Sequence, residues 1–190
     1  INAGDGDDTI QGGDGNDELQ TGAGDDIVYG EGGDDTIIQN GSGSQTYDGG
    51  SGTDTLKVDT SEGWVGTLNS SYPNSIEVNM ATGIVGQTNN PNKRDTFTNM
   101  ENITFVGSFD TLLTGDGNAN IIIGGSGNDT FVIHQNDGIT TINDFTIDDD
   151  SIFLDFSSFD DFLIEQENNN ALIKKGNITY ASLLNVNAND

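Results

Sequence analysis

The stretch that decides the fold is residues 3–38, which read AGDGDDTIQ, GGDGNDELQ, TGAGDDIVY and GEGGDDTII. Each of these four blocks has nine residues, with aspartate at its sixth position and an aliphatic residue at its eighth. Gln39 is one extra residue, and the spacing then continues through 40–48, where Gln45 replaces the aspartate, and 49–57. Two more blocks fill residues 115–132. A fixed period of this kind predicts a repeat architecture in which each block stacks on its neighbours.

The residue types within a block point to a metal site built from oxygen atoms. Glycine recurs at the first, second and fourth positions, where it permits positive φ angles and close approach of the backbone. Such turns can direct carbonyl oxygens inward, and the aspartate adds a charged oxygen. Calcium accepts about six to eight oxygen ligands, carbonyls included. The remaining residues suffice for a short strand whose middle side chain enters a narrow core. One such block alone could be an ordinary glycine turn, but the repetition favours stacked metal sites.

The composition requires counter-charge from outside the chain. There are 32 acidic residues against 5 basic ones, a net charge of −27, and only 32% of the residues are hydrophobic. A chain of this kind stays disordered unless cations offset the repulsion. The few basic residues form no stripe, which argues against nucleic acid and anionic membranes as partners. Cysteine is absent, so disulfides and thiolate sites are excluded. No segment is apolar and long enough to span a membrane, and no signal peptide is visible. Because the sequence opens within a repeat, we expect it to be part of a longer protein.

The blocks resemble the nonapeptide G-G-x-G-x-D-x-U-x of RTX (repeats-in-toxin) proteins, which bacteria secrete by the type I route. The resemblance implies an all-β fold, a right-handed parallel β-roll (β-solenoid) with several Ca²⁺ ions between its turns. It also implies that sixth-position residues two blocks apart share an ion. These pairs are Asp8 with Asp26, Asp17 with Asp35, and Asp35 with Asp54. The partner position of Asp26 on its other side is Gln45, which predicts a weak or empty site there.

The candidate metal ligands implied by the resemblance are the sixth-position side chains and the backbone of the second and fourth positions. They are Gly4, Gly6, Asp8, Gly13, Gly15, Asp17, Gly22, Gly24, Asp26, Gly33, Asp35, Gly50, Gly52, Asp54, Asn118, Asn120, Gly125, Gly127 and Asp129. Four further acids could contribute: Asp95, Glu101, Asp137 and Asp144. For Asp95 and Glu101 the alternative interpretation is a solvated acid on a strand edge.

The remaining segments predict an insert and a cap. Residues 58–114 interrupt the blocks, and within them 75–86 predict two strands joined by a turn at 81–83. Residues 61–72, with Trp64, predict a protruding loop. Residues 95–115 resemble a stretch that often precedes RTX repeats, and 142–159 resemble the segment that closes RTX rolls. We therefore expect roll repeats over 1–57, a β-rich insert that continues the roll over 58–114, and further repeats over 115–132. Residues 133–190 are expected to form a β cap and the type I secretion region, with short strands after residue 161.

Catalysis has little support in the sequence. His134 is the only histidine, and there is no His-Glu-x-x-His motif or Cys–His pair. We expect a calcium-binding domain, not an enzyme, that folds on Ca²⁺ capture outside the cell and serves the export of a type I secreted bacterial protein. Its partners would be calcium ions and the secretion machinery, and its location extracellular or at the cell surface. The alternative is a glycan- or surface-binding module of an adhesin or of an extracellular polysaccharide-modifying enzyme. That alternative needs an exposed aromatic platform, for which Tyr47, Trp64 and Tyr72 are the candidates.

Overall fold

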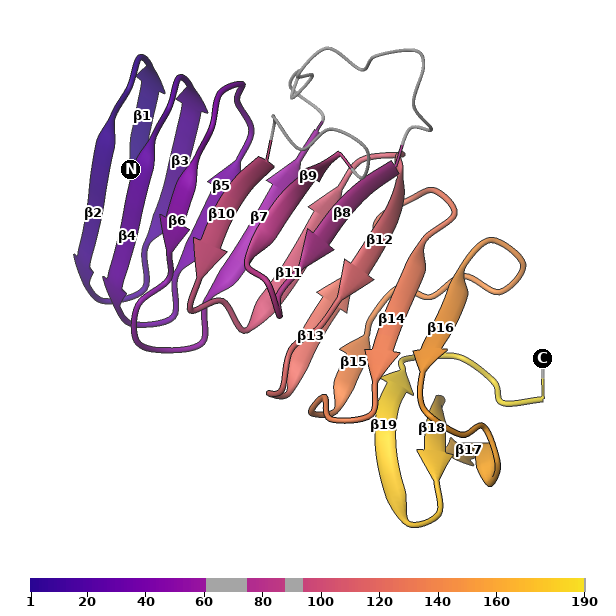
Figure 1. Ribbon diagram of the computed structural model, residues 1–190. Coiled ribbons are helices and arrows are strands. Elements are labelled where there is room, and N and C mark those ends of the chain that lie inside the picture. Colours follow the sequence, from indigo (N-terminus) through magenta and orange to yellow (C-terminus); the bar gives the residue numbers. More distant parts are fainter. Residues whose placement is uncertain (61–74, 88–93, 190) are drawn as a thin grey trace.

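The computed structural model describes residues 1–60, 75–87 and 94–189, which form two facing sheets (Figure 1). The first, sheet A, has ten strands in the order β1 (Asn2–Asp5), β3 (Glu18–Ala23), β5 (Thr36–Gln39), β7 (Thr55–Asp59), β11 (Asn102–Val106), β13 (Asn120–Ile123), β15 (Thr140–Ile142), β19 (Ile178–Leu183), β18 (Asn170–Lys175) and β17 (Phe162–Glu167). The second, sheet B, has nine, in the order β16 (Ser151–Asp155), β14 (Thr130–His134), β12 (Asp110–Thr114), β8 (Ser75–Asn79), β9 (Ile84–Gln87), β10 (Arg94–Thr98), β6 (Thr46–Asp48), β4 (Ile27–Gly32) and β2 (Thr9–Asp14).

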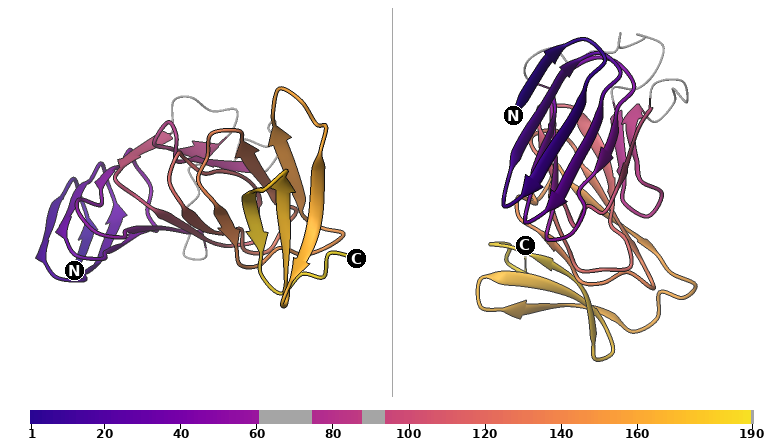
Figure 2. Two further views of the ribbon diagram at one scale, coloured as in Figure 1. Left: turned by 90° about the horizontal axis from the view of Figure 1, so that it is seen from below. Right: turned by 90° about the vertical axis from the view of Figure 1, so that its left-hand side faces the viewer.

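The nine-residue blocks produce this architecture because successive blocks alternate between the two sheets. Strands two blocks apart therefore become neighbours in one sheet, and they pair in parallel, with Thr9 opposite Ile27 and Glu18 opposite Thr36. Figure 2 shows the resulting flattened coil from two further directions. The all-β parallel roll implied by the repeats is confirmed.

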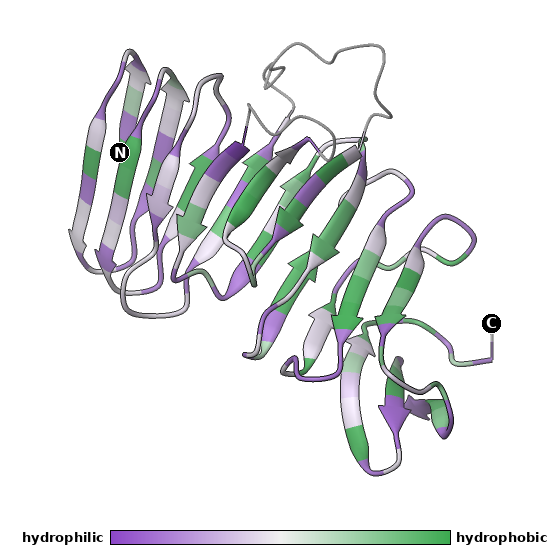
Figure 3. Ribbon diagram, in the orientation of Figure 1, coloured by the Kyte–Doolittle hydropathy of each residue, from purple (hydrophilic) through white to green (hydrophobic). Residues whose placement is uncertain are grey.

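The eighth position of each block supplies the core. Leu19, Val28, Ile37 and Leu56 are completely buried between the sheets. Successive side chains on a strand point to opposite faces, so the seventh and ninth residues face outward. Figure 3 shows this alternation of hydrophobic and hydrophilic residues along the strands.

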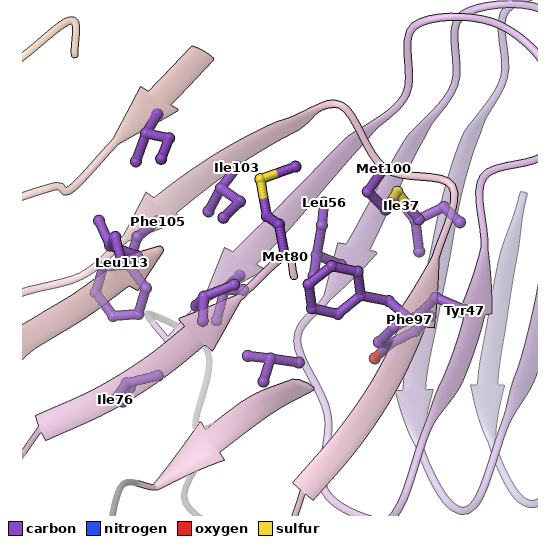
Figure 4. Packing of buried hydrophobic residues seen from close by; sticks show 14 of the residues in the cluster. Ile37, Tyr47, Leu56, Ile76, Met80, Phe97, Met100, Ile103, Phe105 and Leu113 are labelled. Atoms are coloured by element: carbon purple, nitrogen blue, oxygen red, sulfur yellow. The ribbon is translucent and has the colours of Figure 1, made fainter. Parts of the chain in front are cut away.

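The insert adds strands to one sheet only. The strand, turn and strand predicted over 75–86 are present as β8 and β9, and β9 runs antiparallel to both β8 and β10. In sheet A, β7 pairs directly with β11, whereas β10, β9 and β8 separate β6 from β12 in sheet B. A regular coil would place one strand there, so sheet B is two strands wider over this stretch. Large side chains fill the interior here, including Met80, Phe97, Met100 and Phe105 (Figure 4). The loop predicted over 61–72, with Trp64 and Tyr72, lies outside the described residues.

The C-terminal end is closed by an antiparallel meander. The short strands predicted after residue 161 are β17, β18 and β19, and β19 joins sheet A by pairing in parallel with β15. Phe156 packs edge-to-face against Phe162 and Tyr180, with ring centroids 4.8 and 4.9 Å apart. This second cluster gives the cap a core of its own. In the described part of the chain, no helix is long and apolar enough to cross a membrane.

Candidate metal centres

The turns of the roll lie along two edges. At the edge that we call AB, the chain passes from sheet A to sheet B, in the turns at 6–8, 24–26 and 40–45. At the edge that we call BA, it returns from sheet B to sheet A, in the turns at 15–17, 33–35 and 49–54. Sixth-position residues that belong to alternate blocks therefore stack at the same edge.

Hydrogen bonds join these residues into a ladder at the BA edge. The backbone N–H of Asp17 donates to Oδ1 of Asp35 (2.8 Å), and that of Asp35 donates to Oδ1 of Asp54 (2.7 Å). The Asp54 N–H donates to Oε2 of Glu101 (2.7 Å), a residue 47 positions further along the chain. The structure thus brings the expected aspartates together and adds Glu101 to their row.

The AB edge has a corresponding ladder of mixed composition. The Asp8 N–H donates to Oδ1 of Asp26 (3.0 Å), and the Asp26 N–H donates to Oε1 of Gln45 (2.7 Å). The Gln45 N–H in turn donates to Oδ1 of Asp95 (2.8 Å). Asp95 is only 4% exposed, so the interpretation of this residue as a solvated acid is wrong.

In four of the repeat aspartates, the second carboxylate oxygen is the group that requires a cation. Oδ2 is buried and has no hydrogen-bond partner among the described residues in Asp17, Asp26, Asp35 and Asp54. Leaving a buried charged oxygen unpaired costs more than a normal hydrogen bond contributes. These orphaned oxygens fit ligation of a metal ion.

Glycine at the first position of a BA-edge block keeps space open beside that oxygen. A methyl group on Gly12 would lie 2.7 Å from the carbonyl oxygen of Gly30 and 3.0 Å from Oδ2 of Asp17. Gly30 and Gly49 have the same surroundings, namely their own block's carboxylate and a carbonyl from the next turn. The space is lined by oxygen, which is the donor set that calcium prefers.

The glycines of the second and fourth positions shape the turns. All those proposed as ligands there have positive φ, namely Gly4, Gly6, Gly13, Gly15, Gly22, Gly24, Gly33, Gly50, Gly52, Gly125 and Gly127. Many also touch the turn below: a methyl group on Gly22 would overlap the carbonyl oxygen of Gly4. The carbonyls of these positions therefore lie between stacked turns.

Beyond the insert, the AB-edge ladder resumes at Asp129. Its Oδ1 accepts hydrogen bonds from the backbone N–H (2.9 Å) and the hydroxyl (2.6 Å) of Thr111, and its own N–H donates to Oδ1 of Asp150 (2.9 Å). Sequence reasoning did not assign Asp150 as a site residue, although it lies in the segment that resembles the closing stretch of RTX rolls. Asp144 accepts from the N–H groups of Gly124 (2.9 Å) and Gly125 (2.7 Å).

The other candidates are engaged in local hydrogen bonds. Asn120 accepts from the N–H of Asp116 (3.0 Å), and its amide donates to the carbonyl of Glu101 (3.0 Å). Asn118 donates to the carboxylate of the same Asp116. Asp137 accepts from the N–H of His134 (2.8 Å) and so closes a turn after β14.

Burial without a cation raises the pKa of these carboxyl groups. Desolvation is the main cause for Asp26 and Asp54, and neighbouring carboxylates add to it. Desolvation likewise raises the pKa of Asp95 to about 7 and that of Asp129 to about 6. In the described part of the chain, no three histidine, cysteine or acidic side chains gather into a metal site by themselves. Ligation would therefore combine carboxylates with backbone carbonyls.

The RTX calcium-binding nonapeptide repeat matches the chain in four copies, over residues 2–37 and 106–132. No curated protein sequence matches. Among solved structures, the chain is similar to the extracellular lipase LipA from Serratia marcescens, with 13% identity and a TM-score of 0.35. That match covers 92% of this chain and 37% of the lipase chain, so it spans little more than a third of the lipase. The repeat match and the stacked aspartate turns together show that the chain carries RTX calcium-binding nonapeptide repeats, a class found in secreted bacterial proteins.

Proposed function

We propose that this chain is a calcium-responsive folding module of a type I secreted bacterial protein and is not itself an enzyme. The observation that carries the proposal is the set of four buried carboxylate oxygens without a partner, stacked along the two edges of the roll. A cation bound there would neutralise the carboxylates and join consecutive turns. Because this site exists only in the folded chain, the binding free energy becomes folding free energy.

Calcium would be held by Asp8, Asp17, Asp26, Asp35 and Asp54 together with carbonyls of the second and fourth positions. The arrays end beyond the insert with Asp129 and Asp150. We expect affinities of about 10⁻⁴–10⁻³ M, as in other extracellular calcium modules. The repeats would then remain unfolded in a cytosol poor in calcium and become ordered outside the cell. Residues 133–190 would cap the roll and contain the export region.

A calcium titration followed by circular dichroism tests the proposal. In EDTA the spectrum should lack the strand signal, and calcium should restore it in a sigmoidal manner because neighbouring turns support each other. Magnesium is the control, since it demands tight octahedral geometry and keeps its waters. A strand-rich spectrum in EDTA that calcium leaves unchanged would contradict the proposal.

The alternative, a glycan- or surface-binding module, gains no support from the described residues. Tyr47, one of the three aromatic candidates for a binding platform, is completely buried, so its assignment to an exposed platform is wrong. It occupies the eighth position of its block, whose side chain faces the core. The two other candidates lie outside the described residues.

A further inference from the structure

Consecutive turns stack on one another along the AB edge, and we call each such contact between turns a step. One step differs from all the others: it joins the turn at 24–26 to the turn at 40–45 and to the start of β10. Here Gln45 replaces the aspartate, Gln39 is the extra residue between blocks, and Asp95 comes from the insert. We infer that this step, which we call the amide joint, binds no calcium and is closed by side-chain amide groups in place of an ion. The inference rests on the proposed calcium function of the other steps.

The Gln45 side chain makes the two contacts that connect its turn to the turn below. Its Oε1 accepts from the Asp26 N–H, as a carboxylate oxygen does elsewhere in the ladder. Its Nε2 donates to the carbonyl oxygen of Gly24 at 2.8 Å. Gly24 is a fourth-position residue, so this carbonyl belongs to the set proposed to ligate calcium. An N–H donor occupies it instead.

Asp95 is supplied with donors in the same way. Its Oδ1 accepts the Gln45 N–H at 2.8 Å, and its Oδ2 accepts the side-chain amide of the fully buried Gln39. Asp26, Asp35 and Asp54 each have one oxygen hydrogen-bonded and one without a partner. In Asp95 both oxygens are hydrogen-bonded, and none is left to call for a cation.

The first position is also occupied by larger residues where these two turns meet. First-position glycines leave the space beside the carboxylate open at the BA edge, but the two blocks that meet here have Thr21 and Asn40 at that position. Thr21 is completely buried, and its hydroxyl has no hydrogen-bond partner among the described residues. Tyr47 enters the core beside Phe97, where the other blocks of the N-terminal roll have aliphatic residues (Figure 4). Side chains therefore occupy the volume that glycine keeps free elsewhere.

The consequence is a roll whose calcium dependence is uneven. At the same level of the coil, the BA edge has Asp35, Asp54 and Glu101 in its ladder, so one edge depends on calcium while the other is joined by amides. The amide joint connects the N-terminal repeats to the insert through the pairing of β6 with β10. It can form before the ions bind and can serve as the place where calcium-driven ordering of the repeats begins.

Counting bound ions by native mass spectrometry tests the inference. Asp95→Asn should bind as many calcium ions as the unmodified chain, because no ion uses this carboxylate. Asp35→Asn is the positive control and should bind fewer. If Asp95→Asn loses an ion, the amide joint is a calcium site and the inference fails. If the unmodified chain binds no calcium at all, the proposed function fails instead.

A second variant decides the matter should Asp95→Asn fail to fold. Gln39→Met removes the donor to Asp95 at nearly constant volume, so it should lower the urea midpoint at saturating calcium, and a tenfold higher calcium concentration should not restore it. Gln11→Met is the matched control, since this amide makes an exposed contact with Glu31 (3.1 Å). Recovery of the Gln39→Met midpoint with added calcium would show that an ion can replace the amide, which overturns the inference.

Discussion

Asp35 and Asp26 occupy equivalent positions in the two ladders but should contribute unequally to calcium binding. Asp35 stands between two other carboxylates, Asp17 and Asp54, whereas Asp26 has Asp8 on one side and the neutral Gln45 on the other. Substitution by asparagine keeps an oxygen to accept the ladder hydrogen bond and removes only the charge. Asp35→Asn should therefore weaken two sites, and Asp26→Asn one.

The size of the difference follows from mass action. A site with a dissociation constant of about 10⁻⁴–10⁻³ M contributes roughly 1.4–2.7 kcal/mol to folding at about 10 mM calcium. Asp26→Asn should thus lower the free energy of unfolding by about 1.4–2.7 kcal/mol, and Asp35→Asn by about twice as much. Urea unfolding at this calcium concentration measures both values.

Asp34→Asn provides a control with the same change of charge. Asp34 is the exposed fifth-position neighbour, and its Oδ1 accepts the Thr53 N–H at 2.9 Å, so it belongs to an outer row of hydrogen bonds. This variant should change stability by less than about 1 kcal/mol. Equal losses for Asp35→Asn and Asp26→Asn would refute the sharing of one aspartate between two sites. A loss of the same size for Asp34→Asn would show that net charge, not position, sets the response.

Three other outcomes are expected. Without calcium, the raised pKa values of Asp95 (about 7) and Asp129 (about 6) mean that the folded chain holds more protons than the unfolded chain between about pH 4 and 7. The calcium-free chain should therefore approach the folded state most closely in acid and lose up to about 4 kcal/mol of folding free energy through Asp95 as the pH rises from about 4 to about 7, and a strand signal in EDTA that grows with pH would contradict this. Gly50→Ala should cost about 1–3 kcal/mol because φ is 98° and a methyl group would overlap a carbonyl of the turn below, while Gly176→Ala, with φ of 60° and open space, should cost less in the same melting experiment. Phe156→Ala should remove about 3–5 kcal/mol from the cap and make the calcium titration less cooperative, and an unchanged titration would show that the roll folds without its cap.

The sequence predicts those parts of the fold that depend on the period of nine. Burial of the eighth position follows from the spacing, and stacking of Asp8 on Asp26 follows from the resemblance of the blocks to RTX repeats. The hairpin of β8 and β9 follows from local pattern. None of these requires knowledge of contacts between distant segments.

The rest depends on pairings that no spacing encodes. Asp95 meets Gln45 across 50 residues, because β10 returns to pair with β6 after β8 and β9 have moved ahead in sheet B. Its burial therefore could not be inferred, and neither could its contact with Gln39, which appears in the sequence only as an irregularity of the repeat. Glu101 and Asp150 join the ladders by the same kind of non-local placement.

The two additional strands of sheet B change the direction of the long axis of the roll. Neighbouring strands are spaced by about 4.8 Å and facing sheets by about 10 Å, so one wall gains about 10 Å that the other lacks. This difference in width between the two facing sheets turns the long axis by an angle of up to about one radian. The left view of Figure 2 shows that the molecule is curved. The insert is thus a bend in the roll that contains no linker. It sets the angle between the repeats that precede it and those that follow it, and the hydrophobic core continues through it. A β-roll can in this way change the direction of its axis by adding strands to one of its two sheets. The surfaces on the two sides of the bend then face different directions in space.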